Sequence, residues 1–165
     1  MKAEAVQILF SAKLLFESAQ EFCLAEEKYS SSAGLISLQD ALELVFLAVL
    51  IEAGRDATVA IEKLDFDSKI GELKKAGLNV IKSGTLKALN KQRVIVKHYG
   101  QLAEPQTVSN YLAVTSSVID DLLQQSMGCS LNQIFLHELL DIGESNTQIG
   151  QAQSERRRTN WTGTV

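Results

Sequence analysis

Proline, cysteine and aromatic residues are scarce in this chain of 165 residues, and each scarcity excludes a class of protein. The chain has one proline and two cysteines, and aromatic residues make up 6% of it. A sheet with many tight turns uses more proline and more aromatic residues, whereas abundant Ala, Leu, Glu, Gln and Lys favour helices. We therefore expect an all-α protein with one hydrophobic core.

The two cysteines, Cys23 and Cys129, lie far apart, with no CxxC spacing and no histidine cluster beside them. Such a pair predicts neither a zinc site nor a disulfide framework. We expect reduced thiols, with Cys23 in the core, and we expect no metal ion and no other cofactor.

Long apolar runs and common sequence motifs are also lacking. The longest apolar run, LVFLAVLI at 44–51, is much shorter than the roughly 20 residues that cross a bilayer. The first ten residues do not resemble a signal peptide, so we predict a soluble cytoplasmic protein with no membrane partner. Because no Gly-rich phosphate loop, HExxH or GxSxG string occurs, the common ATPase, metalloprotease and hydrolase interpretations lack support.

Acidic residues are missing from one long stretch. The chain has 16 basic and 20 acidic residues and a net charge of -4, which argues against a general nucleic-acid coat. No Asp or Glu occurs between Glu72 and Glu104, and this acid-free window holds seven basic residues: Lys74, Lys75, Lys82, Lys87, Lys91, Arg93 and Lys97. The window is either a basic solvated face or a local anion site.

Helical periodicity organises the chain. Apolar residues recur every three or four positions from about 2 to 28, which predicts a long first helix. The string SSSAGLIS then interrupts the pattern, and Ser37 is the candidate N-cap of a second helix over 38–53. That helix is apolar on nearly all sides, so we expect it to be central or part of a dimer seam.

Four more helices are expected. The first is short and capped, from Asp67 to Gly77, and the second begins at 83–85 and stops at Gly100. The third begins at Pro105 and closes at Gly128, and the fourth follows the cap Ser130. Because residues beyond about 143 are polar and have no helical stripe, we predict a helical domain over 1–142 and a flexible polar tail over 143–165.

The segment LNKQRVIVKHYG, residues 89–100, combines an arginine with one of the two histidines. Arg93 and His98 are five positions apart, which is about 140° around a regular helix, so they do not lie side by side. Either the Gly100 stop lets His98 turn toward Arg93, or a second copy of the chain brings two such pairs into one cleft. Cations near a helix C-terminus are also favoured by the helix dipole alone.

Chemically, this pair suits RNA cleavage without a metal. An imidazole can take the proton from a ribose 2′-hydroxyl or return one to the leaving oxygen. A guanidinium can hold the phosphate and stabilise the charge that grows on it in the transition state. Arg93 and His98 are therefore the candidate catalytic residues. The candidate RNA-binding residues are Lys87, Asn90, Lys91, Lys97 and Tyr99.

The same segment, placed after two long helices and before a proline-initiated helix, resembles the HEPN superfamily of small helical domains. Its signature is Arg, four to six residues, then His, and Arg93 and His98 match the two positions. The resemblance implies a HEPN-like bundle of four to five helices that forms a two-fold homodimer with both motifs in one cleft. It also implies a metal-independent endoribonuclease that leaves 2′,3′-cyclic phosphate ends.

The resemblance further implies a role in toxin–antitoxin or antiviral defence, with RNA as substrate and an antitoxin or neighbour-encoded defence protein as a possible partner. Active members usually have a polar residue directly after the arginine, whereas this chain has Val94, for which Asn90 is a candidate substitute. The departure supports a second interpretation. In it, the chain is a non-catalytic HEPN-like dimer that binds a nucleotide or a partner protein in a defence or regulatory complex.

Three further polar residues deserve an interpretation. Asp40 and Glu43 lie on the apolar second helix, where polar groups need partners. They either hydrogen-bond toward the basic cleft or, in the case of Asp40, lie in an exposed first turn. His137 has no second histidine nearby, so we expect it to be no metal ligand.

Overall fold

The computed structural model describes residues 1–134, and the regular elements in that range are all helical. The chain divides into two units, 1–132 and 133–165, of which the first forms the bundle described below. Its α-helices are α1 (Ala3–Cys23), α2 (Lys28–Glu52), α3 (Phe66–Lys75), α4 (Ser83–Tyr99) and α5 (Pro105–Met127). The short 3-10 helices are η1 (Arg55–Ala57), η2 (Ile61–Lys63) and η3 (Leu131–Gln133). The all-α prediction is confirmed.

Several predictions fall beyond the described residues. The last predicted helix after Ile134, His137 within it, the domain boundary at 142 and the polar tail over 143–165 all lie outside them.

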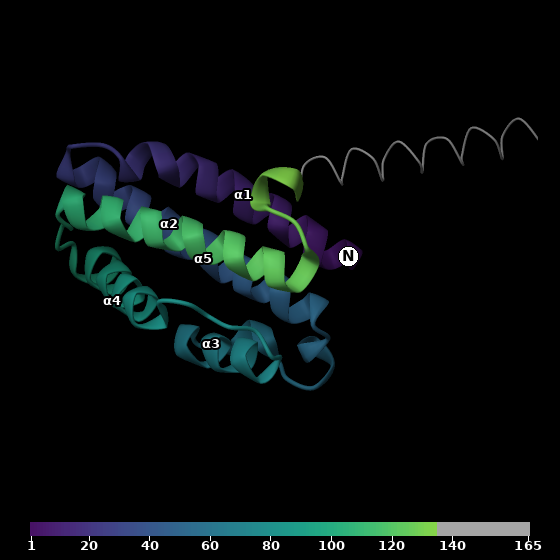
Figure 1. Cartoon of the computed structure of the whole chain (residues 1–165). Helices are drawn as coiled ribbons and strands as arrows, with labels where there is room; N and C mark the ends of the chain where they lie inside the picture. Colours follow the sequence, from purple (N-terminus) through teal and green to yellow (C-terminus); the bar gives the residue numbers. More distant parts are fainter. Residues whose placement is uncertain (135–165) are drawn as a thin grey trace, which may run out of the picture. The chain divides into compact units, whose positions relative to one another are not determined.

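Helix α2 is the centre of the bundle, because it contacts each of the other four α-helices. Figure 1 shows α1 and α5 running alongside α2, while α3 and α4 follow one another along another side. The side chains of Leu38, Leu42, Phe46 and Leu50 are fully buried along α2. Burial on several sides explains why the second helix is apolar almost all round, and its predicted central position is confirmed.

By length and composition, α2 could span a membrane, and it is the one helix of the described residues that could. Its most apolar window is 67% buried inside the bundle, which is typical of the core helix of a soluble protein. The structure is therefore compatible with a soluble protein.

The predicted boundary between the first two helices was wrong. Helix α1 ends at Cys23, and α2 begins at Lys28 rather than after Ser37. Its N-cap is Glu27, whose carboxylate accepts hydrogen bonds from the backbone N–H groups of Tyr29 and Ser30. The residues that looked like a helix breaker, SSSAG, therefore form the first two turns of α2.

Tertiary contacts explain why SSSAG is helical. Ser32 is buried, and its hydroxyl accepts a hydrogen bond of 2.9 Å from the backbone N–H of Ala103, far along the chain. Gly34 lies against the end of α1, where a β-carbon would come within 2.6 Å of the Cys23 backbone nitrogen. These small residues allow two helices to approach closely. In the sequence alone they resemble a turn, because serine and glycine often form turns.

The other predicted helix ends agree with the structure to within two residues, although α3 runs from Phe66 to Lys75 rather than from Asp67 to Gly77. Helix α3 is capped by Asp65, whose carboxylate accepts from the Ser68 N–H at 2.7 Å. Helix α4 stops at Gly100, which takes the left-handed conformation with φ 65°. Helix α5 begins with Pro105 in its first turn and ends before Gly128, also left-handed. Signals that act within a few residues predicted these ends correctly.

Both cysteines are buried free thiols, as expected. Burial raises the pKa of Cys23 to about 12 and also raises the pKa of Cys129. Both shifts disfavour the thiolate, which is the reactive form of cysteine.

Candidate phosphate site on helix α4

Helix α4 presents three different faces to its surroundings. Leu86, Leu89 and Val96 are buried in the core. Positions 90, 93 and 97 follow one another along the flank next to α2, because residues three and four apart share a face. Positions 87, 91, 94 and 98 form a second row, which is turned toward solvent. Arg93 and His98 therefore belong to different rows of the same helix.

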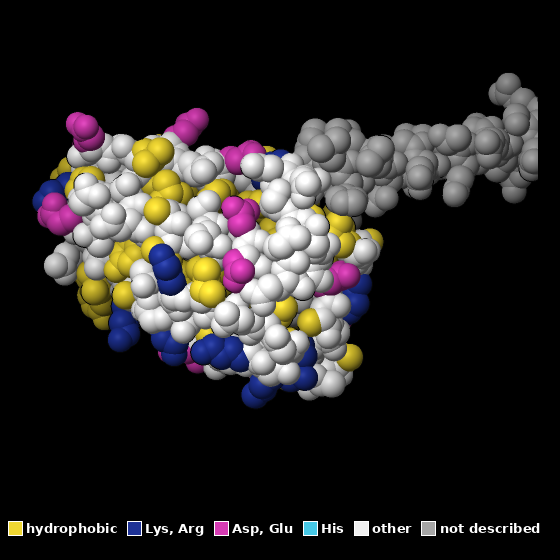
Figure 2. Space-filling model, in the orientation of Figure 1, with side chains coloured by type: hydrophobic (Ala, Val, Ile, Leu, Met, Phe, Trp, Pro, Cys, Tyr) yellow, Lys and Arg dark blue, Asp and Glu magenta, His cyan; other side chains and the backbone are white. Residues whose placement is uncertain are grey.

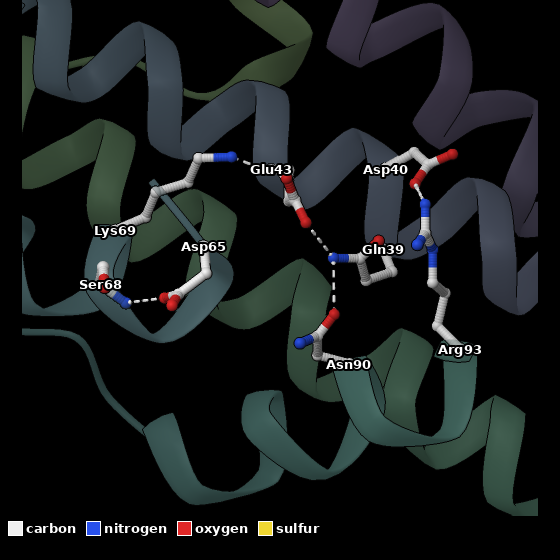
Figure 3. Close-up of polar contacts among 8 residues, drawn as sticks. All are labelled: Gln39, Asp40, Glu43, Asp65, Ser68, Lys69, Asn90 and Arg93. Carbon is white, nitrogen blue, oxygen red and sulfur yellow. Dashed lines mark hydrogen bonds and ion pairs between the residues drawn. The ribbon is translucent and has the colours of Figure 1, made fainter. Parts of the chain in front are cut away.

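Arg93 is held against α2 by Asp40. Its Nη2 atom donates to Asp40 Oδ1 at 2.7 Å, and the arginine side chain is 18% exposed against 41% for the aspartate. Figure 3 shows the guanidinium of α4 reaching across to the carboxylate of α2. Asp40 does not lie in an exposed first turn, because α2 begins twelve residues earlier at Lys28. The interpretation that it bonds toward the basic segment is confirmed.

His98 is exposed in the last turn of α4 and makes no hydrogen bond or ion pair with another described residue. The helix is regular up to Tyr99, so the left-handed Gly100 follows His98 without turning it toward Arg93. Within one chain, the structure does not bring the two candidate catalytic side chains into hydrogen-bond contact. Their separation of about 140° around the helix explains this result.

Asn90 is engaged with a buried glutamine rather than with Arg93. The Gln39 amide donates to Asn90 Oδ1 at 3.1 Å and also to Glu43 Oε1. Glu43 in turn forms an ion pair of 2.7 Å with the almost buried Lys69 of α3. Figure 3 shows this row of contacts joining α3, α2 and α4. Asn90 therefore helps to fix α4 against α2.

Glu43 is ionised within that row. Burial is the largest single influence and raises the pKa of its carboxyl group, but hydrogen bonds from Lys69 and Gln39 lower it. The positive charges of Lys69 and Arg93 lower it further, so the net shift is below the ordinary value. The row is held by charge-assisted hydrogen bonds, which are stronger than neutral ones.

Two buried atoms beside this row have no hydrogen-bond partner among the described residues: the Nε of Arg93 and the Oε1 of Gln39. An unpaired buried donor costs about 1–3 kcal/mol, so such atoms are uncommon in folded proteins. The α2–α4 seam therefore contains buried polar atoms that the described residues do not satisfy.

The remaining predicted RNA-binding residues differ in their exposure and in whether they form ion pairs. Lys87 pairs with Asp67 of α3 at 3.1 Å. Lys91 and Lys97 are exposed and have no ion pair with a described residue. Tyr99 is 78% exposed, and Val94 is 36% exposed. Val94 therefore puts an apolar side chain in the solvent-facing row between Lys91 and His98.

Charge on the surface follows the acid-free window. Figure 2 shows Lys and Arg side chains gathered along the lower edge of this face, where α3 and α4 lie, whereas most Asp and Glu side chains lie over α1 and α5. Three residues of the window have acidic partners: Lys75, Lys87 and Arg93. The other four, Lys74, Lys82, Lys91 and Lys97, are exposed and unpaired among the described residues. This surface suits an anionic ligand.

Residues 1–134 hold no group of three or more His, Cys, Asp or Glu side chains that could bind a metal ion. The chain matches no family model, no curated protein and no solved structure.

Sequence reasoning missed two participants in the seam, Gln39 and Lys69. Gln39 had a visible signal, since an amide on a helix that is apolar almost all round must find a partner when it is buried. Lys69 lies on the short helix predicted from Asp67 to Gly77, for which the sequence indicated no buried face. Its burial against Glu43 depends on how α3 sits on α2, which no local pattern reveals.

Proposed function

We propose that the chain is a HEPN-type RNA endonuclease that acts as a two-fold homodimer without a metal ion. His98 serves as general acid or base, Arg93 holds the phosphate, and Lys91 and Lys97 hold the RNA backbone. The observation that carries the proposal is the surface of α4. In that surface, an exposed histidine and exposed lysines, none of them paired with a described residue, lie on the same helix as a nearly buried arginine five positions before the histidine.

The reaction uses the ribose 2′-hydroxyl as nucleophile. One imidazole takes the proton of this hydroxyl as the new bond between the 2′-oxygen and phosphorus forms. The bond from phosphorus to the 5′-oxygen breaks, and a protonated imidazole gives its proton to that leaving oxygen. The products are a 2′,3′-cyclic phosphate and a free 5′-hydroxyl. Negative charge grows on the phosphate oxygens during this step, where a guanidinium stabilises it.

A single chain does not supply all the catalytic groups that this step uses. The mechanism uses one base and one acid, whereas α4 carries one histidine, and Arg93 lies on another row of the helix. A two-fold pair of chains supplies two histidines and two arginines to one cleft. A homodimer is therefore part of the proposal rather than an addition to it.

The direct test is cleavage of mixed single-stranded RNAs by purified protein in EDTA. We expect products with cyclic phosphate ends. We expect His98→Ala to lower the rate at least about a hundredfold, as loss of an acid–base group commonly does, and Arg93→Ala to lower it by a similar factor, as loss of a group that stabilises transition-state charge does. Asp56→Asn, remote from α4, is the matched control and should cleave normally. If Arg93→Ala and His98→Ala both cleaved RNA at the wild-type rate, the proposal would be overturned.

Mixed dimers test whether two histidines act together. Wild-type and His98→Ala chains with different tags are co-expressed in equal amounts and purified as a mixture. If one cleft needs both histidines, only wild-type homodimers cleave, which is about a quarter of the dimers at random pairing. Activity near one half would show that each chain cleaves alone.

Val94 favours a second candidate function, a non-catalytic HEPN-like dimer that binds a nucleotide or a partner protein. Its side chain is 36% exposed in the middle of the solvent-facing row, where it would contact a ligand through apolar surface. This candidate predicts that Arg93→Ala and His98→Ala variants keep their biological activity and still co-purify with a neighbour-encoded partner. Loss of activity in both variants would count against it.

A further inference from the structure

The contact between Arg93 and Asp40 leaves N–H donors of the terminal guanidinium nitrogens unused, whereas the Nε is buried and out of reach of a ligand. Asp40 accepts from Nη2 at 2.7 Å, and the Nε of Arg93 has no partner among the described residues. Arginine has five N–H donors in a planar fork, and carboxylates often take two of them in parallel. Here Arg93 donates one hydrogen bond to the Asp40 carboxylate. Donors of the two terminal nitrogens remain for another anion.

Asp40 also compensates the charge of the nearly buried Arg93. The Arg93 side chain is 18% exposed, and a guanidinium that is withdrawn from water needs a nearby anion. Asp40 is the recorded ion-pair partner of Arg93 among the described residues. Removing its charge leaves only the weaker, longer-range attraction of the Glu43 carboxylate, so we expect the long side chain to leave the seam for solvent.

The backbone that carries Asp40 is itself fixed. Its neighbour Gln39 is fully buried and donates to both Asn90 and Glu43. Lys69 holds Glu43 from α3. Figure 3 shows Asp40 and Arg93 at one end of this row of contacts. The carboxylate is therefore presented from a rigid part of α2, as a positioning group requires.

We infer that Asp40 is a positioning residue that holds Arg93 ready for the RNA phosphate. The inference rests on the proposed ribonuclease activity and extends it to α2. Asp40 does not touch the substrate phosphate, which its negative charge would repel. It fixes the guanidinium at the α2–α4 seam through one N–H, and the phosphate takes the donors that remain.

The test compares Asp40→Asn with a matched variant. Asparagine keeps the size and an acceptor oxygen but removes the charge that holds Arg93. Asp56→Asn is the control, because Asp56 is also 41% exposed and pairs with Lys2 at 3.5 Å, away from α4. We expect Asp40→Asn to lower kcat by about 10-fold or more, as loss of orientation does, with a smaller change in KM. We expect Asp56→Asn to change neither.

A second arm separates positioning from a general loss of structure. In the Arg93→Ala background, Asp40→Asn should have no further effect on kcat, because residues that act as a unit are not additive. Thermal unfolding of each variant is followed by circular dichroism. Additive losses, or a loss in kcat that only follows unfolding, would overturn the inference.

A binding measurement distinguishes failure of the inference about Asp40 from failure of the proposed function. RNA with 2′-O-methyl riboses, which cannot form the cyclic phosphate, serves as a binding probe alongside the cleavable RNA. If the wild type neither cleaves RNA nor binds the probe, the proposed function fails and the inference fails with it. If the wild type cleaves and Asp40→Asn cleaves as fast or faster, the inference alone is overturned.

Discussion

At the scale of single residues, Glu72 shows how a carboxylate links two parts of the chain. It lies on α3, is 7% exposed, and pairs with Arg55 of η1 and with Lys75 one turn along the helix. The hydrogen bond from Lys75 lowers the pKa of Glu72, and the hydrogen bond from Arg55 lowers it further, against a smaller opposing effect of desolvation. The folded chain therefore favours the ionised form.

This shift predicts a dependence of stability on pH. Because the folded pKa of Glu72 lies below its ordinary value of 4.5, its contribution is complete above that value and is lost as pH falls through the folded pKa. We expect Glu72→Gln to lower the urea midpoint at pH 7. We also expect the variant and the wild type to converge as the pH falls through the lowered folded pKa, where the native carboxylate is protonated too.

Urea unfolding followed by circular dichroism at pH 7, 5 and 3.5 measures this effect. Glu62→Gln is the control, because Glu62 is exposed on η2 and has no ion pair with a described residue. Its urea midpoint should follow that of the wild type at every pH. A difference between Glu72→Gln and the wild type that stays constant from pH 7 to the lowest pH at which both proteins remain folded would contradict the predicted role of ionisation.

Arg93 illustrates what residue patterns can and cannot reveal. Its spacing from His98 predicted that the two side chains would not meet on a regular helix, and they lie on different rows of α4. The polar positions on the apolar second helix indicated that Asp40 would need a partner. Which cation it finds depends on the register between α2 and α4. That register is set by buried contacts such as the one between Gln39 and Asn90.

At the scale of elements, the crossing of α1 and α2 depends on Gly34. A β-carbon there would lie 2.6 Å from the Cys23 nitrogen and 2.8 Å from the Phe22 β-carbon, both of which belong to the rigid end of α1. Gly34→Ala should destabilise the fold by about 1–3 kcal/mol, as overpacking does, although alanine is the better helix former. The urea midpoint of the purified variant measures the loss.

Gly71 provides the matched comparison within another helix. Nothing lies within 4 Å of a β-carbon placed there, and the residue is in the interior of α3. Gly71→Ala should therefore leave stability unchanged or raise it by up to about 1 kcal/mol. If the two alanine variants behaved alike, close helix packing at Gly34 would not be the cause.

The same glycine explains which elements could be predicted from the sequence. Helices α3, α4 and α5 have ends set by Asp65, Gly100, Pro105 and Gly128, whose effects reach only a few residues. The start of α2 depends on distant residues, since Gly34 meets Cys23 and Ser32 meets Ala103. Small and hydroxyl residues form turns in isolation, but here tertiary contacts reverse that tendency.

At the scale of the whole molecule, the overall charge and the local charge have opposite signs. The chain carries -4 overall, yet the window from 73 to 103 contains no acidic residue. Four of its lysines have no ion pair with a described residue. The proposed function predicts that RNA binds at the face formed by this window, since exposed charges act over about 10 Å at ordinary salt.

Salt dependence tests that division of the surface. Each phosphate contact made by a lysine contributes about 0.7 to the slope of log K against log salt for single strands. Lys91→Gln should therefore weaken binding of 2′-O-methyl RNA to a similar degree for different sequences and reduce this slope by about 0.7. Lys63→Gln, on η2 outside the window, removes the same charge from another place and should leave the slope unchanged. Equal effects of the two substitutions would mean that net charge, rather than the α4 surface, governs the binding of RNA.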